Sequence, residues 1–297
     1  RGGTGMRRIA GAGLQRVAPG AQLAFHHRLQ AIAEGEQFGA QAPPAVGVGY
    51  LGLANIHLLR GELDAAQSRL DKGMRLAEQI AFSESMEEIW LLRMQIALAG
   101  RHYAQAAELL AAAEARLQTT VVGAPLRRRW ALLHVLLALA LGDTQGAKVW
   151  VVQDGPEHPA PGEARSIREA LHQRELLTKA RVCLAQGETR QARGLLERIS
   201  EQAVWLHCCE RAVLLAQCCA AEGHERGAIE NMAQAVRMAA PQRVRLPFLV
   251  AGEPSAGLLR KILAQAEDVP QRAFVAGVLQ QIGEAAPTAD NLTEPLS

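Results

Sequence analysis

Apolar residues recur at helical spacing along most of the chain, and the pattern is clearest over Glu175–Gln242. Two segments of similar design follow each other there, each with an apolar stretch, a glycine, a short polar turn and a second apolar stretch. Gly187 is followed five residues later by Ala192, and Gly223 by Ala228. Apolar positions three and four residues apart form one face of a helix. The pattern therefore predicts two helix–turn–helix units in tandem.

The same design, with drift, occurs three more times upstream, from Ala45 onward. The first three turns fall at Gly61, near Gly100 and at Gly142, and the alanines that mark the five second helices are Ala66, Ala106, Ala147, Ala192 and Ala228. These alanines lie 36 to 45 residues apart, a looser spacing than the ~34 of an ideal tetratricopeptide (TPR) repeat. Glycine ends a helix where a left-handed backbone costs least, and alanine fits where two helices cross closely. Since neighbouring pairs must complete each other's core, we predict an all-α fold, a right-handed superhelical solenoid of TPR-like helix pairs.

The pattern divides the chain into four parts. Residues 1–20 are glycine-rich and poorly patterned, whereas residues 21–242 carry the repeat array, beginning with an amphipathic helix over 21–39. A loop over 154–162, rich in proline and glycine, interrupts the array between its third and fourth units. Residues 243–284 are expected to form capping helices, with two helices near Ser255–Glu267 and Pro270–Gly283. Residues 285–297 have the composition of a linker.

The composition is that of a helical globular protein. Of the 297 residues, 49% are hydrophobic and 4% aromatic, and the formal net charge is +2. A charge so close to neutral does not indicate nucleic-acid binding by this chain. The first residues lack the apolar core of a signal peptide, and the longest apolar run, Trp130–Leu141, is too short to span a bilayer. We therefore expect a cytoplasmic protein, and the odd number of cysteines, five, agrees with that expectation.

The side chains that most often carry chemistry show no catalytic or metal-binding pattern. Four cysteines lie within Cys208–Cys219. If they share one helix, the two pairs are about 15 Å apart along its axis, too far to ligate one ion. We interpret them as small buried hydrophobic residues, with a redox sensor as the alternative. The sequence contains neither an H-E-x-x-H nor a G-x-S-x-G motif, so we predict no catalytic residue, no metal site and no enzyme.

Several segments resemble one family of transcription regulators. The segment ELLTKARVCLAQGETRQARGLLERI, at Glu175–Ile199, is similar to a signature of the MalT-like regulators, which are large ATP-dependent activators of the LuxR family. The A-x-x-W sequence at Ala147–Trp150 and the P-F-L-x-x-G sequence at Pro247–Gly252 resemble the same family. The closing NLTEPLS is similar to the junction that precedes the family's helix-turn-helix module. In order along the chain, these segments are more specific than any one of them alone.

The resemblance implies a sensor region that transmits inducer or partner binding to an ATPase module and a DNA-binding module outside this fragment. No cofactor is expected in this fragment, because the sequence has no G-x-x-x-x-G-K-[ST] loop; ATP is expected in the parent's N-terminal module. The expected partners are a small-molecule inducer or a regulatory protein in the groove, further copies of the parent protein, and DNA through the C-terminal module only. The alternative is a stand-alone TPR-type scaffold that docks proteins and has no small-molecule ligand.

The candidate binding site is the inner face of the solenoid, because the first helices of such arrays line the concave wall. Counting back eleven residues from the marker alanines gives Asn55, Gln95, Leu136, Arg181 and Gln217; counting back eighteen gives Val48, Glu88, Arg129, Arg174 and Glu210. Most of these residues are polar, so we predict a ligand-binding groove formed by Asn55, Glu88, Gln95, Arg129, Arg174, Arg181, Glu210 and Gln217. A solvated helix face would show the same pattern without a ligand. Trp90, Trp130 and Trp205 either stack on a ring of the ligand or belong to the core.

Overall fold

The computed structural model describes Ile32 and residues 44–79, 83–119, 123–153, 165–200, 203–266 and 268–284. These residues form helices and no strand, which confirms the predicted all-α class. The expected segment 1–20, the loop over 154–162 and the linker 285–297 lie outside the described residues, as does the helix expected over 21–39 apart from Ile32. Among the described helices, none combines the length and apolar character needed to cross a bilayer.

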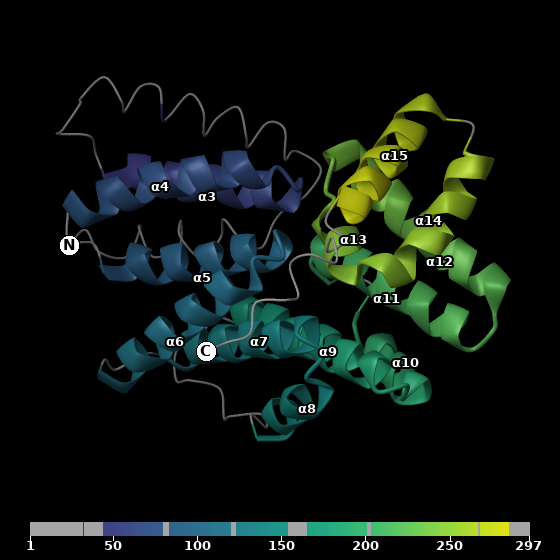
Figure 1. Ribbon diagram of the computed structural model, residues 1–297, viewed down its shortest axis with the longest axis horizontal. Helices are drawn as coiled ribbons and strands as arrows, with labels where there is room; N and C mark the ends of the chain where they lie inside the picture. The colour runs from purple at the N-terminus through teal and green to yellow at the C-terminus, as the bar shows by residue number, and fades with distance from the viewer. Residues whose placement is uncertain are drawn as a thin grey trace.

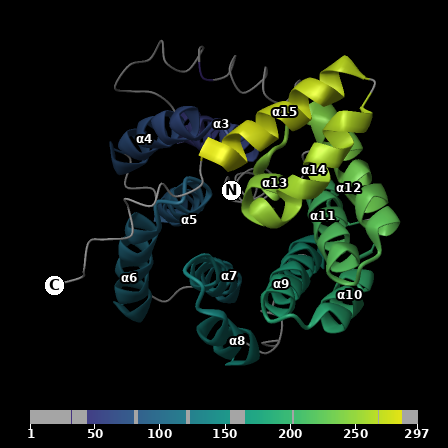
Figure 2. The ribbon, with the colours of Figure 1, turned by 45° about the vertical axis from the view of Figure 1, so that its right-hand side comes forward.

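The five predicted units are all present as pairs of helices. The pairs are α3 (Pro44–Leu59) with α4 (Leu63–Gln79), α5 (Ser83–Ala99) with α6 (Tyr103–Thr119), α7 (Ala124–Ala140) with α8 (Thr144–Gln153), α9 (Arg165–Ala185) with α10 (Thr189–Glu197), and α11 (Trp205–Ala221) with α12 (Glu225–Ala239). Each first helix packs against its partner and against the first helix of the next unit. Figure 2 shows the first helices on the inside of a curved stack and the second helices outside it. The solenoid predicted from the repeat pattern is confirmed.

All five marker alanines are completely buried, as the repeat pattern predicts. Ala66, Ala106, Ala147, Ala192 and Ala228 each have an exposed fraction of 0%. Each of them follows the left-handed residue of its turn by five positions. The small side chain lets the second helix approach the first closely, and the turn fixes which residue of the second helix arrives there.

The five turns share one backbone conformation, but only four of them use glycine for it. Gly61, Gly142, Gly187 and Gly223 have φ angles of 74° to 79°. In the second unit the left-handed residue is Arg101, with φ 57°, rather than the predicted Gly100. The backbone N–H of Arg101 donates to the carbonyl of Leu98 at 3.1 Å, as Gly61 does to Leu58 at 2.9 Å. The left-handed residue thus lies one position after Gly100, because in all five units it precedes the buried alanine by five residues.

The strain at Arg101 predicts a measurable difference between two substitutions. Arg101→Gly should be more stable than Arg101→Ala by about 1 kcal/mol, because a Cβ crowds the backbone in the left-handed conformation. Both variants lose the same arginine side chain, so the comparison isolates the backbone. Urea denaturation of the two proteins checks it. Equal midpoints would show that the turn relaxes to another conformation when the arginine is lost.

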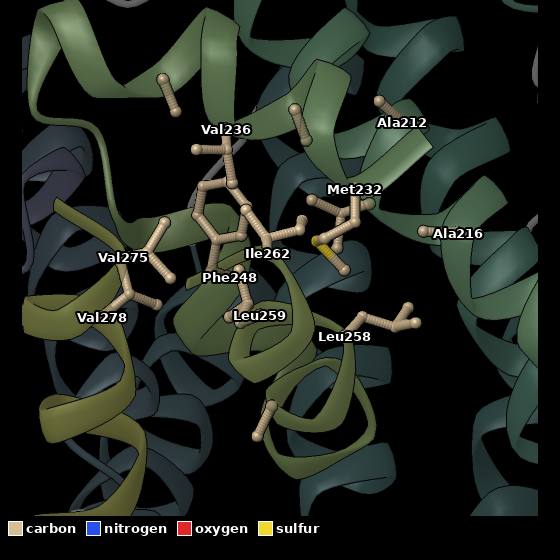
Figure 3. Close-up of a cluster of buried hydrophobic side chains, with 14 of the residues drawn as sticks. Ala212, Ala216, Met232, Val236, Phe248, Leu258, Leu259, Ile262, Val275 and Val278 are labelled. Atoms are coloured by element: carbon tan, nitrogen blue, oxygen red, sulfur yellow. The ribbon is translucent and has the colours of Figure 1, made fainter. Parts of the chain in front are cut away.

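The C-terminal helices cover the end of the array. A short 3₁₀ helix at Ala240–Gln242 leads into α13 (Leu246–Ala251), α14 (Glu253–Gln265) and α15 (Val269–Glu284), and the last two lie near the helices expected there. Phe248 of α13 is completely buried among side chains of α11, α12, α14 and α15. Its ring packs edge-on against Phe274, with centroids 5.8 Å apart. Figure 3 shows the Phe248 ring between Val236, Ile262 and Val275. This aromatic side chain joins four helices into one core.

The same C-terminal helices also contact the first unit, far away in sequence. The backbone N–H of Arg245 donates to the carbonyl of Leu59 at 2.8 Å, and Gln281 Nε2 donates to the carbonyl of Gly61 at 3.1 Å. A Cβ added at Gly61 would lie 2.9 Å from Leu249 Cδ1, so a larger residue requires the Leu249 side chain to move. The curved stack therefore closes on itself, with α15 reaching the first unit (Figures 1 and 2). We name these contacts between residues 59–61 and the C-terminal helices the closure contact.

Candidate functional site

Five of the eight predicted site residues lie together on the inner helices. Glu88 of α5 accepts two hydrogen bonds from Arg129 of α7, one of them from Nη2 at 2.9 Å. Arg181 of α9 donates through Nη2 to Glu210 of α11 at 2.8 Å. Arg174 of α9 interacts electrostatically with all four of these residues. We call Glu88, Arg129, Arg174, Arg181 and Glu210 the inner charged cluster.

The repeat register explains why these side chains meet. The four residues eighteen positions before their marker alanines, Glu88, Arg129, Arg174 and Glu210, occupy equivalent places on successive first helices. Helix α7 contacts α5 and α9, and α9 contacts α11, so equivalent places become neighbours. Arg181 lies two helical turns after Arg174 on the same face and reaches Glu210 on the next helix. The sequence therefore predicts the proximity of these residues, although not how they pair.

The inner charged cluster and the residues beside it contain more arginines than glutamates. Arg128 and Glu175 form a further ion pair between α7 and α9, with Nε and Oε1 3.6 Å apart. Glu88, Glu175 and Glu210 each have an arginine partner, namely Arg129, Arg128 and Arg181. Arg174 has no such carboxylate partner within the described part of the chain. Four arginines thus face three glutamates, which leaves one positive charge in excess on the inner face.

Burial and neighbouring charges act on the ionisable groups of the cluster. Burial lowers the pKa of Arg174, and the cations Arg129 and Arg181 act in the same direction. Burial would raise the pKa of Glu210, but Arg181, His207 and Arg174 together bring it below its ordinary value. Glu210 is therefore a carboxylate at neutral pH, held in that form by the guanidinium groups of Arg181 and Arg174.

A buried histidine packs next to this cluster. His207 of α11 is 4% exposed, and its Nδ1 lies 3.0 Å from Oε1 of Gln173 on α9. Burial lowers the pKa of His207 to about 4, so the imidazole is neutral at physiological pH. Gln173 and His207 were not singled out from the sequence. The only signal was their position, since Gln173 precedes Arg174 and His207 lies one helical turn before Glu210.

His207 predicts a loss of stability in mild acid. The unfolded chain binds a proton near the ordinary histidine pKa of about 6.5, whereas the folded chain binds it near 4. Stability therefore falls as the pH decreases through this window, by about 2 kcal/mol at pH 5. We expect His207→Gln, which keeps a donor for Gln173, to lose this part of the pH dependence. Urea denaturation of both proteins at pH 7 and pH 5 measures it; parallel pH dependences would contradict the assignment.

The three remaining predicted residues do not join the cluster. Asn55 is buried in α3, and Gln95 is partly buried in α5. Gln217 of α11 donates through Nε2 to Ser255 Oγ at 3.0 Å and to the carbonyl of Ala251 at 3.3 Å. Gln217 is therefore engaged by α13 and α14, although its side chain stays partly exposed, and its contact with a ligand stays a prediction.

The tryptophans and cysteines belong to the packing of the helices. Trp130 is buried in a hydrophobic cluster of α5, α6 and α7, and Trp90 packs against the same cluster. Trp205 packs against Leu59, Leu206 and Val244. The four cysteines of α11 are free thiols, and all except Cys208 are buried, as expected for small hydrophobic residues. Within the described residues, no three histidine, cysteine or carboxylate side chains come together as metal ligands.

Two comparisons with known proteins bear on this arrangement. No curated protein matches the chain. A family model, described as the MalT-like TPR region, matches residues 10–265, which include all five helix pairs and the inner charged cluster. The match spans most of the sequence and agrees with the solenoid of paired helices. The chain therefore belongs to the MalT-like TPR region family.

Proposed function

We propose that this chain is the effector-binding and protein-interaction region of a LuxR-family, MalT-like transcription regulator of the cytoplasm. The observation that supports this is the inner charged cluster. Four neighbouring helices each direct at least one charged side chain to the same part of the inner face. Guanidinium and carboxylate groups offer many hydrogen bonds to a polar ligand. A ligand or partner bound there contacts four helices at once, and so favours one arrangement of the stack over others.

In this proposal the chain itself carries out no catalysis. Binding on the inner face is transmitted to an ATPase module and a DNA-binding module of the parent protein, and favours its self-association. ATP belongs to that ATPase module, and DNA is contacted only by the DNA-binding module. The helix stack of this chain would have two arrangements that differ in their affinity for the ligand. Binding shifts the equilibrium toward the tighter-binding arrangement by that difference in affinity.

The second candidate is a stand-alone scaffold that docks other proteins. One observation favours it: Leu141 and Val149, both in the third unit, are 60% and 50% exposed. Exposed large apolar side chains suit protein docking more than small-molecule binding. A partner that binds this surface contacts the third unit and does not require the inner charged cluster.

A ligand screen with matched variants tests the proposal. A panel of sugars, organic acids, nucleotides and amino acids is screened by thermal denaturation, since a ligand of the folded chain raises its melting temperature by mass action. Glu88→Gln and Arg129→Lys each weaken the pairing on the inner face, and Arg129→Lys keeps the charge while losing the two-pronged geometry. Both should reduce the shift caused by any hit.

Glu188→Gln is the matched control. Glu188 pairs with Lys148 between two neighbouring units at 3.2 Å, as Glu88 does with Arg129, but this pair is exposed. The control should bind each hit as well as the unchanged protein does. A hit that loses binding in Glu188→Gln but not in Glu88→Gln would place the site elsewhere. The scaffold would be favoured if no small molecule stabilises the protein, and if a protein partner stabilises it but loses binding when Leu141 or Val149 is replaced.

A further inference from the structure

We propose that the ligand of the inner face carries an anionic group, a carboxylate or a phosphate, and that this group binds at Arg174 between the two ion pairs of the inner charged cluster. This inference rests on the proposed function, and it specifies the chemical class of the effector. It follows from the hydrogen bonds, burial and charges of the cluster.

The first observation is the unequal pairing. Glu88 and Glu210 are each engaged by one arginine, and Glu175 beside them is engaged by Arg128. Two cations, Arg129 and Arg181, and two carboxylates, Glu210 and Glu88, lie close enough to Arg174 to act on it electrostatically, so that three arginines face two glutamates. Arg174 is only partly exposed, and in the described part of the chain no carboxylate is within ion-pair distance of it. One positive charge is thus in excess, and an excess charge in a partly buried place is unfavourable unless a further anion joins it.

The second observation is a donor without an acceptor. Arg181 uses Nη2 for Glu210, whereas its Nε is buried and has no hydrogen-bond partner among the described residues. Buried donors are nearly always satisfied, so such an atom calls for an explanation. An oxygen of a bound anion near Arg174 supplies the missing acceptor.

Rearrangement within the cluster does not solve the problem. If Glu88 or Glu210 moved to Arg174, it would leave Arg129 or Arg181 without its present partner. The described cluster thus lacks one negative charge in every pairing. A neutral ligand adds hydrogen bonds but leaves the charge, whereas a carboxylate or phosphate matches the planar fork of a guanidinium and compensates it.

Binding of paired probes tests the inference. Succinate, its neutral diamide succinamide, and inorganic phosphate are titrated into the protein by calorimetry at constant ionic strength, with chloride as the balancing anion. Succinate or phosphate should bind, and the better of the two identifies the group as carboxylate or phosphate. Arg174→Gln should weaken that binding about 10- to 100-fold, as expected for a charged hydrogen-bond partner, and succinamide should bind neither protein.

Arg190→Gln is the matched control, because Arg190 is an exposed arginine of α10 in the same unit. It should bind the probes as the unchanged protein does. Thermal denaturation without added probe shows whether Arg174→Gln is folded. We expect its melting temperature to equal or exceed that of the unchanged protein, because the substitution removes the uncompensated cation.

The remaining outcomes overturn the inference in distinguishable ways. Equal binding of an anion to Arg174→Gln and the unchanged protein would place the anion elsewhere. Succinamide binding as tight as succinate, and dependent on Arg174, would indicate a neutral ligand and keep the proposed function. If neither anion binds while a neutral hit of the screen loses binding in Glu88→Gln, the anion inference fails and the proposed function stands. If no probe depends on the inner cluster, both fail.

Discussion

Phe248→Ala is expected to lower the free energy of unfolding by about 4 kcal/mol. The ring is completely buried and contacts side chains from α11, α12, α14 and α15 (Figure 3). Truncation leaves a cavity that several helices border, and no single helix can move to fill it without losing its own contacts. Urea denaturation, with equal slopes for both proteins, measures the loss.

The control for this substitution lies two residues further along the same helix. Val250 is 45% exposed, so Val250→Ala should change stability by less than about 0.5 kcal/mol. A loss as small as this in Phe248→Ala would mean that α13 is not held in the core. A similar loss in both variants would mean that the helix itself, and not the buried ring, determines the result.

Glu210→Gln should cost about 3 kcal/mol, because it removes one partner of a largely buried ion pair. The side chains of Arg181 and Glu210 are 14% and 18% exposed. The substitution leaves Arg181 beside Arg174 with no carboxylate on this side of the cluster, and like charges in a poorly solvated place repel strongly. The double variant Arg181→Met, Glu210→Met should recover most of the loss, since it removes both charges.

An exposed pair provides the contrast for Glu210. Glu230 pairs with Arg226 on the surface of α12, where the side chains are 62% and 93% exposed, so Glu230→Gln should cost less than about 0.5 kcal/mol.

The pH dependence of stability gives a second check on Glu210. The folded pKa of Glu210 is lowered, so its contribution is present above the unfolded value of about 4.3 and is lost as the pH falls through the folded one. The difference between Glu210→Gln and the unchanged protein should therefore shrink in acid; a constant difference would argue against the charge.

Repeats allow much of this fold to be predicted from local rules. A close crossing of two helices needs a small residue such as alanine, and a left-handed backbone favours glycine. The turns and helix pairs can therefore be placed from the spacing of these residues along the sequence. Arg101 shows the limit of using glycine alone, because the alanine at Ala106 holds the register while the glycine is displaced. The MalT-like TPR region family was also recognisable from segments spread along the chain.

The site was predictable in position but not in detail. The register brings Glu88, Arg129, Arg174 and Glu210 to equivalent places, whereas pairing depends on side-chain geometry that no spacing encodes. The partners of Gln217 could not be predicted for a related reason. Its neighbours Ala251 and Ser255 come from the C-terminal helices, and the periodicity of one repeat contains no information about that distant contact.

The closure contact has a consequence for how the protein unfolds. An ordinary helical array is nearly one-dimensional, so its terminal repeats can fray while the middle stays intact. Here Arg245 and Gln281 bind the first turn, and Val244 and Leu206 are buried with Leu59. Neither the first described unit nor the C-terminal helices can leave without the other losing its contacts. The described part of the chain should therefore unfold in a single cooperative transition, whereas an open array would lose its terminal repeats first.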